Sequence, residues 1–197
     1  MPDNGSQTED PSYPGVDVAS STPEAVRDEP SIAVVVPARN EEKLLPDLLE
    51  SLARELQASV WRWQILVADN GSSDRTAEIA RGAGATVIET SGVTVGQARN
   101  LAVQACDGEV LVFLDADMVV APGWASGVAQ WLPELRESRL LIVGGSIAAP
   151  PDHGWPGRVW FPERGPERRA TRHVGSGHML LCRADFESLG GFDPGLH

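Results

Sequence analysis

The chain has 197 residues, of which 42% are hydrophobic, and this length is typical of a single domain with a substantial core. Acidic residues outnumber basic residues by 28 to 16, and the resulting net charge of −12 repels a phosphate backbone and excludes general nucleic-acid binding. No apolar run approaches the roughly 18 residues that a transmembrane helix needs, and the polar, acidic start is unlike a signal peptide. The expected location is therefore cytoplasmic, either free or peripheral at the inner face of the membrane.

The acidic charge is concentrated at the beginning of the chain. Residues 1–30 contain seven acids against one arginine, together with five prolines and few large apolar side chains. Such a segment cannot bury enough apolar surface to offset the entropy that it would lose on ordering. We therefore predict a disordered acidic tail over residues 1–30, followed by one domain over residues 31–197.

From Ser31 onward, apolar strands alternate with amphipathic helices. The run from Ile32 to Val36 is continuous and largely β-branched, which is typical of a strand buried on both faces of a parallel sheet. Leucines then recur at three- and four-residue spacing, which predicts a helix packed on that sheet. A later helix is expected to carry Pro122 in its first turn.

In chain order, the predicted strands cover residues 32–36, 65–68, 85–88, 109–114 and 140–148, and the predicted helices cover residues 44–56, 75–83, 96–105 and 122–132. This alternation predicts an α/β fold of the doubly wound, Rossmann-like type, with helices on both faces of a mostly parallel central sheet.

In such a fold, ligands bind beyond the carboxyl ends of the strands, so the residues that follow each strand are the informative ones. Polar segments follow the first, second and fourth predicted strands, at residues 37–42, 69–74 and 115–117. Neither a G-x-G-x-x-G motif nor a P-loop follows the first strand, which excludes those two nucleotide-binding motifs at this position.

The pattern Asp115-x-Asp117 is the most specific local indication of a ligand site. Side chains two positions apart in an extended segment point to the same side, so both carboxylates can face one site. At roughly 5 Å and an effective dielectric near 20, their repulsion is on the order of 3 kcal/mol, and a divalent cation would convert it into attraction. Carboxylate oxygens suit Mg²⁺ or Mn²⁺. The alternative is an ordinary turn after a buried strand, where aspartate is common.

Asp69 and Arg99 each have two interpretations. A carboxylate at Asp69 can accept from a nucleobase N–H or a ribose hydroxyl, but an acid followed by Gly71 also fits simple turn chemistry. Arg99 lies in a predicted helix, where an arginine is more often a solvated surface residue than a ligand contact.

Five motifs in sequence are nevertheless hard to obtain by chance. The segments VVVPARNEE (34–42), VADNGSSDRT (67–76), GQARN (96–100) and FLDAD (113–117), followed by VGSG (174–177) through GGFD (190–193), resemble the family 2 glycosyltransferases in order and spacing. The resemblance extends over about residues 31–197. It implies a GT-A fold and transfer of a sugar from a nucleoside-diphosphate sugar, usually with inversion at the anomeric carbon.

The resemblance also implies roles for the nucleoside-binding side of the site. The loop that carries Pro37, Arg39 and Glu41 would border the nucleoside, with Glu41 near the ribose or base. Asp69 would hold the base, typically uracil in the relatives, and Arg99 would lie beside the same base. A UDP-sugar is therefore the favoured donor.

For the other side of the site, the resemblance places Asp115 near the ribose and the metal shell. Asp117 would bind the Mg²⁺ or Mn²⁺ that bridges the diphosphate. By their position, Gly177 and His178 could border the acceptor, such as a lipid or a polysaccharide; the alternative is that His178 is an ordinary polar or packing residue, as a single histidine more often is.

One departure from the family pattern concerns the general base. Inverting relatives carry an acid shortly after the G-G-F-D stretch, whereas this chain stops at His197. Asp185, Glu187 and Asp193 have no strong claim to that role. The sequence therefore looks like the donor-binding part of a C-terminally incomplete GT-A domain, with the base expected after His197.

Two other functions stay open at this point. A catalytically silent nucleotide-sugar-binding module would also lack the base. A sugar-phosphate nucleotidylyltransferase would bind nucleotide and metal in a related domain, but it would usually carry a glycine-rich basic loop, and Arg39 has no surrounding glycines.

Overall fold

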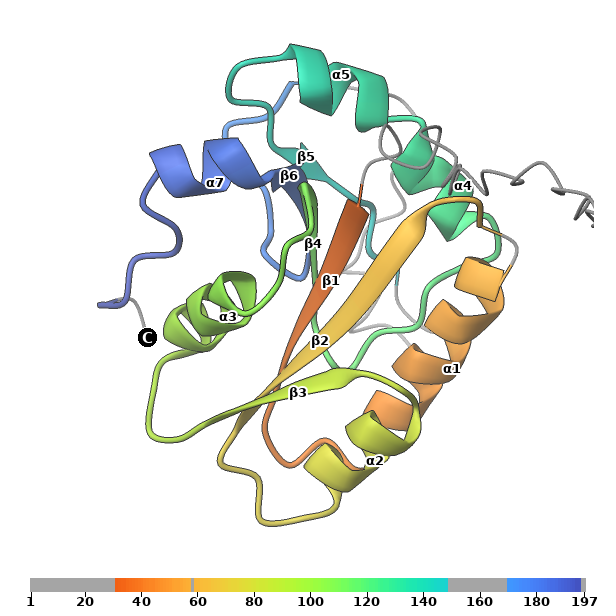
Figure 1. Cartoon of the computed structure of the whole chain (residues 1–197), viewed down its shortest axis with the longest axis vertical. Helices are drawn as coiled ribbons and strands as arrows, with labels where there is room; N and C mark the ends of the chain where they lie inside the picture. The colour runs from red at the N-terminus through yellow and green to blue at the C-terminus, as the bar shows by residue number, and fades with distance from the viewer. Residues whose placement is uncertain (1–30, 58, 149–169, 196–197) are drawn as a thin grey trace, which may run out of the picture.

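The computed structural model describes residues 31–57, 59–148 and 170–195, which form a sheet flanked by helices (Figure 1). The predicted acidic tail lies outside these residues. The strands are β1 (Ser31–Ala38), β2 (Arg62–Asn70), β3 (Thr86–Thr90), β4 (Val110–Leu114), β5 (Val143–Gly144) and β6 (His178–Cys182). The helices are α1 (Leu45–Gln57), α2 (Thr76–Gly82), α3 (Val95–Gln104), α4 (Trp124–Ala129), α5 (Leu132–Glu137) and α7 (Arg183–Ser188).

The strands lie in the order β3-β2-β1-β4-β6-β5. Strand β1 pairs in parallel with β2 and β4, and β2 pairs in parallel with β3. Strand β6 runs antiparallel to both of its neighbours, β4 and β5. The predicted α/β class with a mostly parallel central sheet is therefore confirmed.

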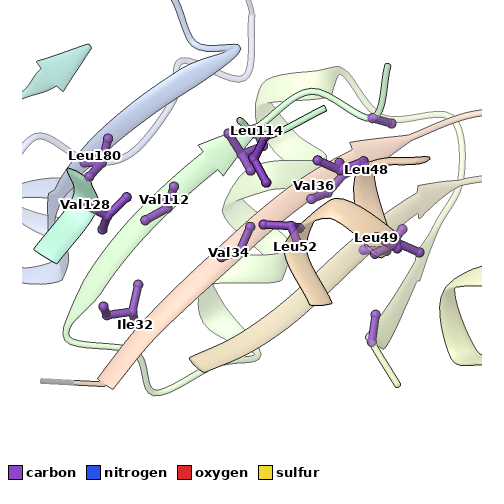
Figure 2. Close-up of a cluster of buried hydrophobic side chains, with 14 of the residues drawn as sticks. Ile32, Val34, Val36, Leu48, Leu49, Leu52, Val112, Leu114, Val128 and Leu180 are labelled. Carbon is purple, nitrogen blue, oxygen red and sulfur yellow. The ribbon is translucent and has the colours of Figure 1, made fainter. Parts of the chain in front are cut away.

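Strand β1 lies at the centre of the sheet, and its alternate residues serve two separate cores. Ile32, Val34 and Val36 are fully buried on the face that α1 covers, and Figure 2 shows Val34 and Val36 beside the leucines of that helix. Ala33 and Val35 are buried on the opposite face, under α3. Burial on both faces explains why the strand is a continuous apolar run rather than an alternating one.

The structure differs from the sequence prediction between residues 122 and 148. The single helix expected over residues 122–132 is two short helices, α4 and α5, and Pro122 precedes α4 instead of lying in its first turn. The strand expected over residues 140–148 is only the two-residue β5. Within the described residues, β5 pairs with β6 alone, through Val143 and Gly144.

Strand β6 was not predicted, although it is paired along its whole length with β4. Its five residues form a short apolar run, and periodicity alone cannot separate such a run from part of a helix. Within the residues that the structure describes, no helix is long and apolar enough to cross a bilayer.

Helix α4 is capped by a side chain from another helix. The carboxylate of Glu55, on α1, accepts hydrogen bonds from the backbone N–H groups of Gly123 (3.0 Å) and Ala125 (3.1 Å). The backbone N–H groups in the first turn of a helix have no acceptor within the helix. A carboxylate at this end also interacts favourably with the helix dipole. Glu55 therefore connects α1 to the start of α4.

Replacing Glu55 by alanine is expected to lower the free energy of unfolding by about 1–2 kcal/mol, because two backbone donors lose their acceptor. Urea denaturation measures this. Glu50→Ala is the matched control, since Glu50 is an exposed acid on the same helix that pairs with Arg54, and its loss should cost less than about 0.5 kcal/mol. Equal losses in the two variants would show that Glu55 does not cap α4.

Candidate functional site

The carboxyl ends of β1, β2 and β4 meet at one edge of the sheet. Ala38, the last residue of β1, is the register partner of Asp69 near the end of β2. Leu114, the last residue of β4, is opposite His178 at the start of β6. The three predicted polar segments therefore emerge side by side, as the fold class predicts.

The loops after β1 and β2 are held together by hydrogen bonds from backbone N–H groups to side-chain oxygens. The N–H of Asn40 donates to the hydroxyl of Ser72 (2.9 Å), and the N–H of Ser73 donates to the Asn40 side-chain oxygen (2.8 Å). The N–H of Glu41 donates to the hydroxyl of Thr76 (2.8 Å). Asn40 has a φ of 58°, a left-handed conformation that asparagine tolerates better than most residues. The two loops are thus one connected unit.

Asp69 is buried beneath this unit. Its carboxylate accepts hydrogen bonds from the backbone N–H of Ser72 (3.3 Å) and from the Ser72 hydroxyl. The turn chemistry considered from the sequence is therefore present. Because an ionised carboxylate has about four lone-pair positions, Asp69 keeps acceptor capacity for a ligand donor.

Arg99 is not a solvated surface residue, so that alternative is wrong. Its side chain is only 5% exposed, and its Nη2 donates to Oδ1 of Asp115 at 2.6 Å. Burial lowers the pKa of Arg99, and the charge of Asp115 partly offsets this. Helix α3 thereby brings a buried cation to the end of β4.

The other oxygen of Asp115 faces Gly177. A Cβ atom built on Gly177 would lie 2.5 Å from Oδ2 of Asp115, and the Asp115 N–H donates to the Gly177 carbonyl (3.2 Å). Asp115 is therefore held on one side by Arg99 and on the other by the backbone just before β6. Gly177 is brought to the site, as the sequence suggested.

Asp117 lies in a different environment from Asp115. Strand β4 ends at Leu114 and Asp117 is in a turn, so the expectation that the two aspartates share an extended segment is wrong. Asp117 is exposed and has no hydrogen bond or ion pair with any residue that the structure describes. Burial raises the pKa of Glu41, and the nearby carboxylates of Asp117 and Asp74 raise it further.

This edge of the sheet thus concentrates negative charge without forming a complete metal cage. Across residues 31–57, 59–148 and 170–195, no group of three or more His, Cys, Asp or Glu side chains is arranged to hold a metal ion. An ion bound here would take one or two carboxylates from the protein and complete its shell with water or ligand oxygens. That donor set is typical of Mg²⁺ bound together with a phosphate.

The remaining predicted residues surround this centre. Pro37 lies in β1 and is partly buried, whereas Arg39 is exposed at the start of the following loop. Of the three acids considered as bases, Asp185 accepts from the N–H groups of Leu140 and Leu141, Asp193 accepts from the N–H of Gly195, and Glu187 pairs with Arg183.

His178 is half-buried at the start of β6, next to Gly177. Its Nε2 accepts a hydrogen bond from the indole N–H of Trp124 (3.0 Å), so the imidazole is neutral. Burial lowers the pKa of His178, and a hydrogen bond with the Ser146 backbone raises it in part. Its role beside an acceptor stays a prediction.

This histidine is expected to make stability depend on pH. Its folded pKa lies below the unfolded value of about 6.5, so the unfolded chain binds the extra proton and stability falls as pH drops below about 6.5. His178→Gln should show a smaller loss between pH 7.5 and pH 5.5 in urea denaturation. His173→Gln, at an exposed position, should retain the loss of the parent protein. The same pH dependence in all three proteins would contradict the assignment.

Four residues of this site were not singled out from the sequence. Ser72 and Thr76 anchor the two loops, Phe192 packs on Arg99, and Asn100 hydrogen-bonds to Phe192. All four lie inside the motif segments, but their partners are distant in sequence. Only the three-dimensional contacts reveal what they hold.

Comparisons with known proteins agree with this arrangement. The 4,4'-diaponeurosporenoate glycosyltransferase of Staphylococcus haemolyticus is 43% identical over 95 residues, which cover 45% of this chain and 24% of that protein. The structure of Staphylococcus aureus TarS 1-349 in complex with UDP-GlcNAc superposes with a TM-score of 0.61 and 22% identity, over 81% of this chain and 47% of that one. The mannosyltransferase PcManGT from Pyrobaculum calidifontis, in complex with GDP-Man and Mn²⁺, gives a TM-score of 0.65 and 21% identity, over 85% and 49%.

This chain therefore spans about a quarter of the relative from S. haemolyticus and about half of each of the two solved chains. The GT-A fold implied by the motifs is confirmed, and the similarity to transferases does not favour a silent module or a nucleotidylyltransferase. The family model described as glycosyl transferase family 2 matches residues 33–190, so the chain belongs to that family.

Proposed function

We propose that the carboxyl edge of this sheet binds a nucleoside-diphosphate sugar and that the protein transfers its sugar to a hydroxyl acceptor. The observation that carries the proposal is the pairing of Asp115 with the buried Arg99, beside an exposed Asp117. The aligned carboxylate of Asp115 fits the hydroxyls of a ribose, and the free carboxylate of Asp117 fits a metal ion bound to a diphosphate.

Each side chain has a task in this proposal. Asp69, with its remaining lone pairs, accepts from the base, and Arg99 lies beside the same base. Asp115 accepts from the ribose, and Asp117 is the protein ligand of a divalent ion. Pro37, Arg39 and Glu41 border the nucleoside.

Mg²⁺ or Mn²⁺ is the proposed cofactor. The residues present fit such an ion, because Asp117 is exposed and free of partners in the described part of the chain. A bound cation would also offset the repulsion between the carboxylates of Asp117 and Glu41. When bound, such an ion supplies a Lewis acid that stabilises the charge on the leaving diphosphate. The solved complex of PcManGT with GDP-Man and Mn²⁺ supports this choice.

The acceptor is proposed to be a lipid or a polysaccharide hydroxyl, approaching from the side of Gly177 and His178. A carboxylate must remove its proton as attack proceeds. Asp185, Glu187 and Asp193 all have other partners, which supports a base outside the residues that the structure describes. A cytoplasmic location, free or peripheral at a membrane, is proposed with it.

Isothermal titration calorimetry tests the donor site. UDP is expected to bind in the presence of Mn²⁺ and to lose most of its affinity when the metal is chelated. ADP is expected to bind more weakly than UDP, and Asp69→Ala should reduce this difference more than it reduces thermal stability. Equal affinity with metal and with chelator would overturn the metal role, and equal binding of UDP and ADP would overturn base recognition by Asp69.

Transfer itself is tested separately, by following release of UDP from UDP-sugars with lipid and polysaccharide acceptors. The full-length protein is expected to release UDP when donor and acceptor are both present, and a form that lacks the proposed base should release it roughly 10²–10⁴-fold more slowly. Binding of UDP without any release by the full-length protein would contradict the transferase function and leave only the donor site.

A further inference from the structure

The turn formed by residues 190–194 is fastened to helix α3 mainly by the side chain of Asn100. The amide group of Asn100 donates from Nδ2 to the carbonyl of Phe192 (2.9 Å) and accepts at Oδ1 from the N–H of Phe192 (2.9 Å). This two-point contact satisfies both backbone groups of Phe192. It fixes where the phenyl ring lies relative to the preceding residue of α3, which is Arg99.

Two glycines allow the turn to approach so closely. Gly191 has a φ of 76°, and a Cβ atom there would lie 2.8 Å from Oδ1 of Asn100. A Cβ atom on Gly96, in the first turn of α3, would lie 3.1 Å from Cβ of Phe192. The hydroxyl of Thr94, at the start of α3, donates to the carbonyl of Pro194 (3.4 Å). Residues of the turn and residues at the start of α3 therefore both contribute to this close contact.

The ring of Phe192 covers the guanidinium of Arg99. Cζ of Arg99 lies 5.2 Å from the ring centroid, a separation typical of a cation–π contact. The ring is held edge-to-face against Phe113 of β4, with centroids 5.1 Å apart and planes at 89°. It also packs against Phe186 of α7 at 5.7 Å.

The covered guanidinium has few competing partners. Nε of Arg99 is buried and has no hydrogen-bond partner among the residues that the structure describes. The hydrogen bond from Nη2 to Asp115 is therefore the main polar contact of the group. The Arg99 end of this ion pair is shielded from water, whereas the Asp115 side chain is 44% exposed. Burial of one partner lowers the local dielectric and strengthens the attraction relative to a fully exposed pair.

We propose that Phe192, held in place by Asn100, is a positioning residue for the donor site, which acts by keeping Arg99 dry and aimed at Asp115. Without the ring, water reaches the guanidinium, competes for its N–H groups and lets the Asp115 carboxylate rotate. The proposal rests on the proposed function, since the benefit of an aligned Asp115 is tighter binding of a metal-loaded nucleoside diphosphate.

The test compares two phenylalanines of the same cluster. Phe192→Leu removes the ring that covers Arg99, whereas Phe186→Leu removes a ring that packs on Phe113 and Phe192, and the cation–π contact of Arg99 is with Phe192. Both variants lose comparable aromatic packing, so both should lose thermal stability. Only Phe192→Leu is expected to weaken binding of UDP with Mn²⁺, by about fivefold. Phe192→Tyr keeps the ring face and should restore the affinity.

A second measurement does not depend on nucleotide binding. NMR follows hydrogen exchange of the Arg99 Nε–H, which should be slow in the parent and in Phe186→Leu and markedly faster in Phe192→Leu. Equal affinity losses in the two leucine variants, or slow exchange in Phe192→Leu, would overturn the positioning role. The three proteins can also show the expected exchange rates while the parent binds no nucleoside diphosphate with Mn²⁺. That result would overturn the proposed function and the donor-site role of Phe192.

Discussion

Asp117→Ala is expected to weaken binding of UDP in the presence of Mn²⁺ by about 100-fold, or about 2.8 kcal/mol. Asp117 is exposed and has no hydrogen bond or ion pair within the described residues, so its carboxylate is free to bind a cation. Its removal should not destabilise the fold. It should instead relieve repulsion with Glu41, whose pKa burial and Asp117 both raise. Calorimetry and thermal unfolding on the same samples measure the two effects.

Asp107→Ala provides the matched control for Asp117→Ala. Asp107 is also exposed and carries the same charge, but it precedes β4, at the opposite end of the strand. Its loss changes the net charge equally and should leave binding of UDP with Mn²⁺ nearly unchanged. If both variants lose affinity alike, the effect is one of overall charge and Asp117 is not a metal ligand. If neither loses affinity, the metal is held elsewhere.

Gly177→Ala is expected to weaken the same binding by about tenfold, because the new methyl group collides with Asp115. The added Cβ would lie 2.5 Å from Oδ2 of Asp115, well inside van der Waals contact. Asp115 cannot simply retreat, since its other oxygen is bonded to the buried Arg99. The carboxylate must therefore leave its aligned position.

Gly175→Ala makes the same substitution two residues earlier, where a Cβ would meet nothing within 4 Å. This variant should bind UDP with Mn²⁺ like the parent. Calorimetry on the two variants at one Mn²⁺ concentration compares them directly. Normal affinity in Gly177→Ala would show that the orientation of Asp115 is unimportant for the ligand.

The parts of the fold that the sequence predicted are those with a local cause. The run from Ile32 to Val36 is apolar at every position because both of its faces are buried, and such a run is visible without any tertiary information. The meeting of Asp69 with the end of β1 follows from the rule that parallel strands end at a common edge.

The parts that escaped prediction depend on contacts between distant residues. Nothing around Arg99 in the sequence indicates that its side chain is 5% exposed, because Phe192 and Asp115 bury and bind it from elsewhere. Strand β6 is recognisable only through its pairing with β4. The different surroundings of Asp115 and Asp117 likewise arise from tertiary contacts, since Arg99 and Gly177 hold Asp115 whereas Asp117 lies in the exposed turn after β4.

The antiparallel strand β6 also has a consequence for the order of folding. Strands β1 to β4 are contiguous in the chain and can pair in parallel as soon as they are made, whereas Gly177 and Phe192 come much later. The bond between Arg99 and Asp115 spans 16 residues, but the bond that fixes Phe192 to Asn100 spans 92. Contacts of such long range close late because loop closure costs more entropy. A nascent chain that ends before β6 would therefore carry the sheet and both aspartates yet bind ligand poorly, and binding competence would be acquired in the last folding step.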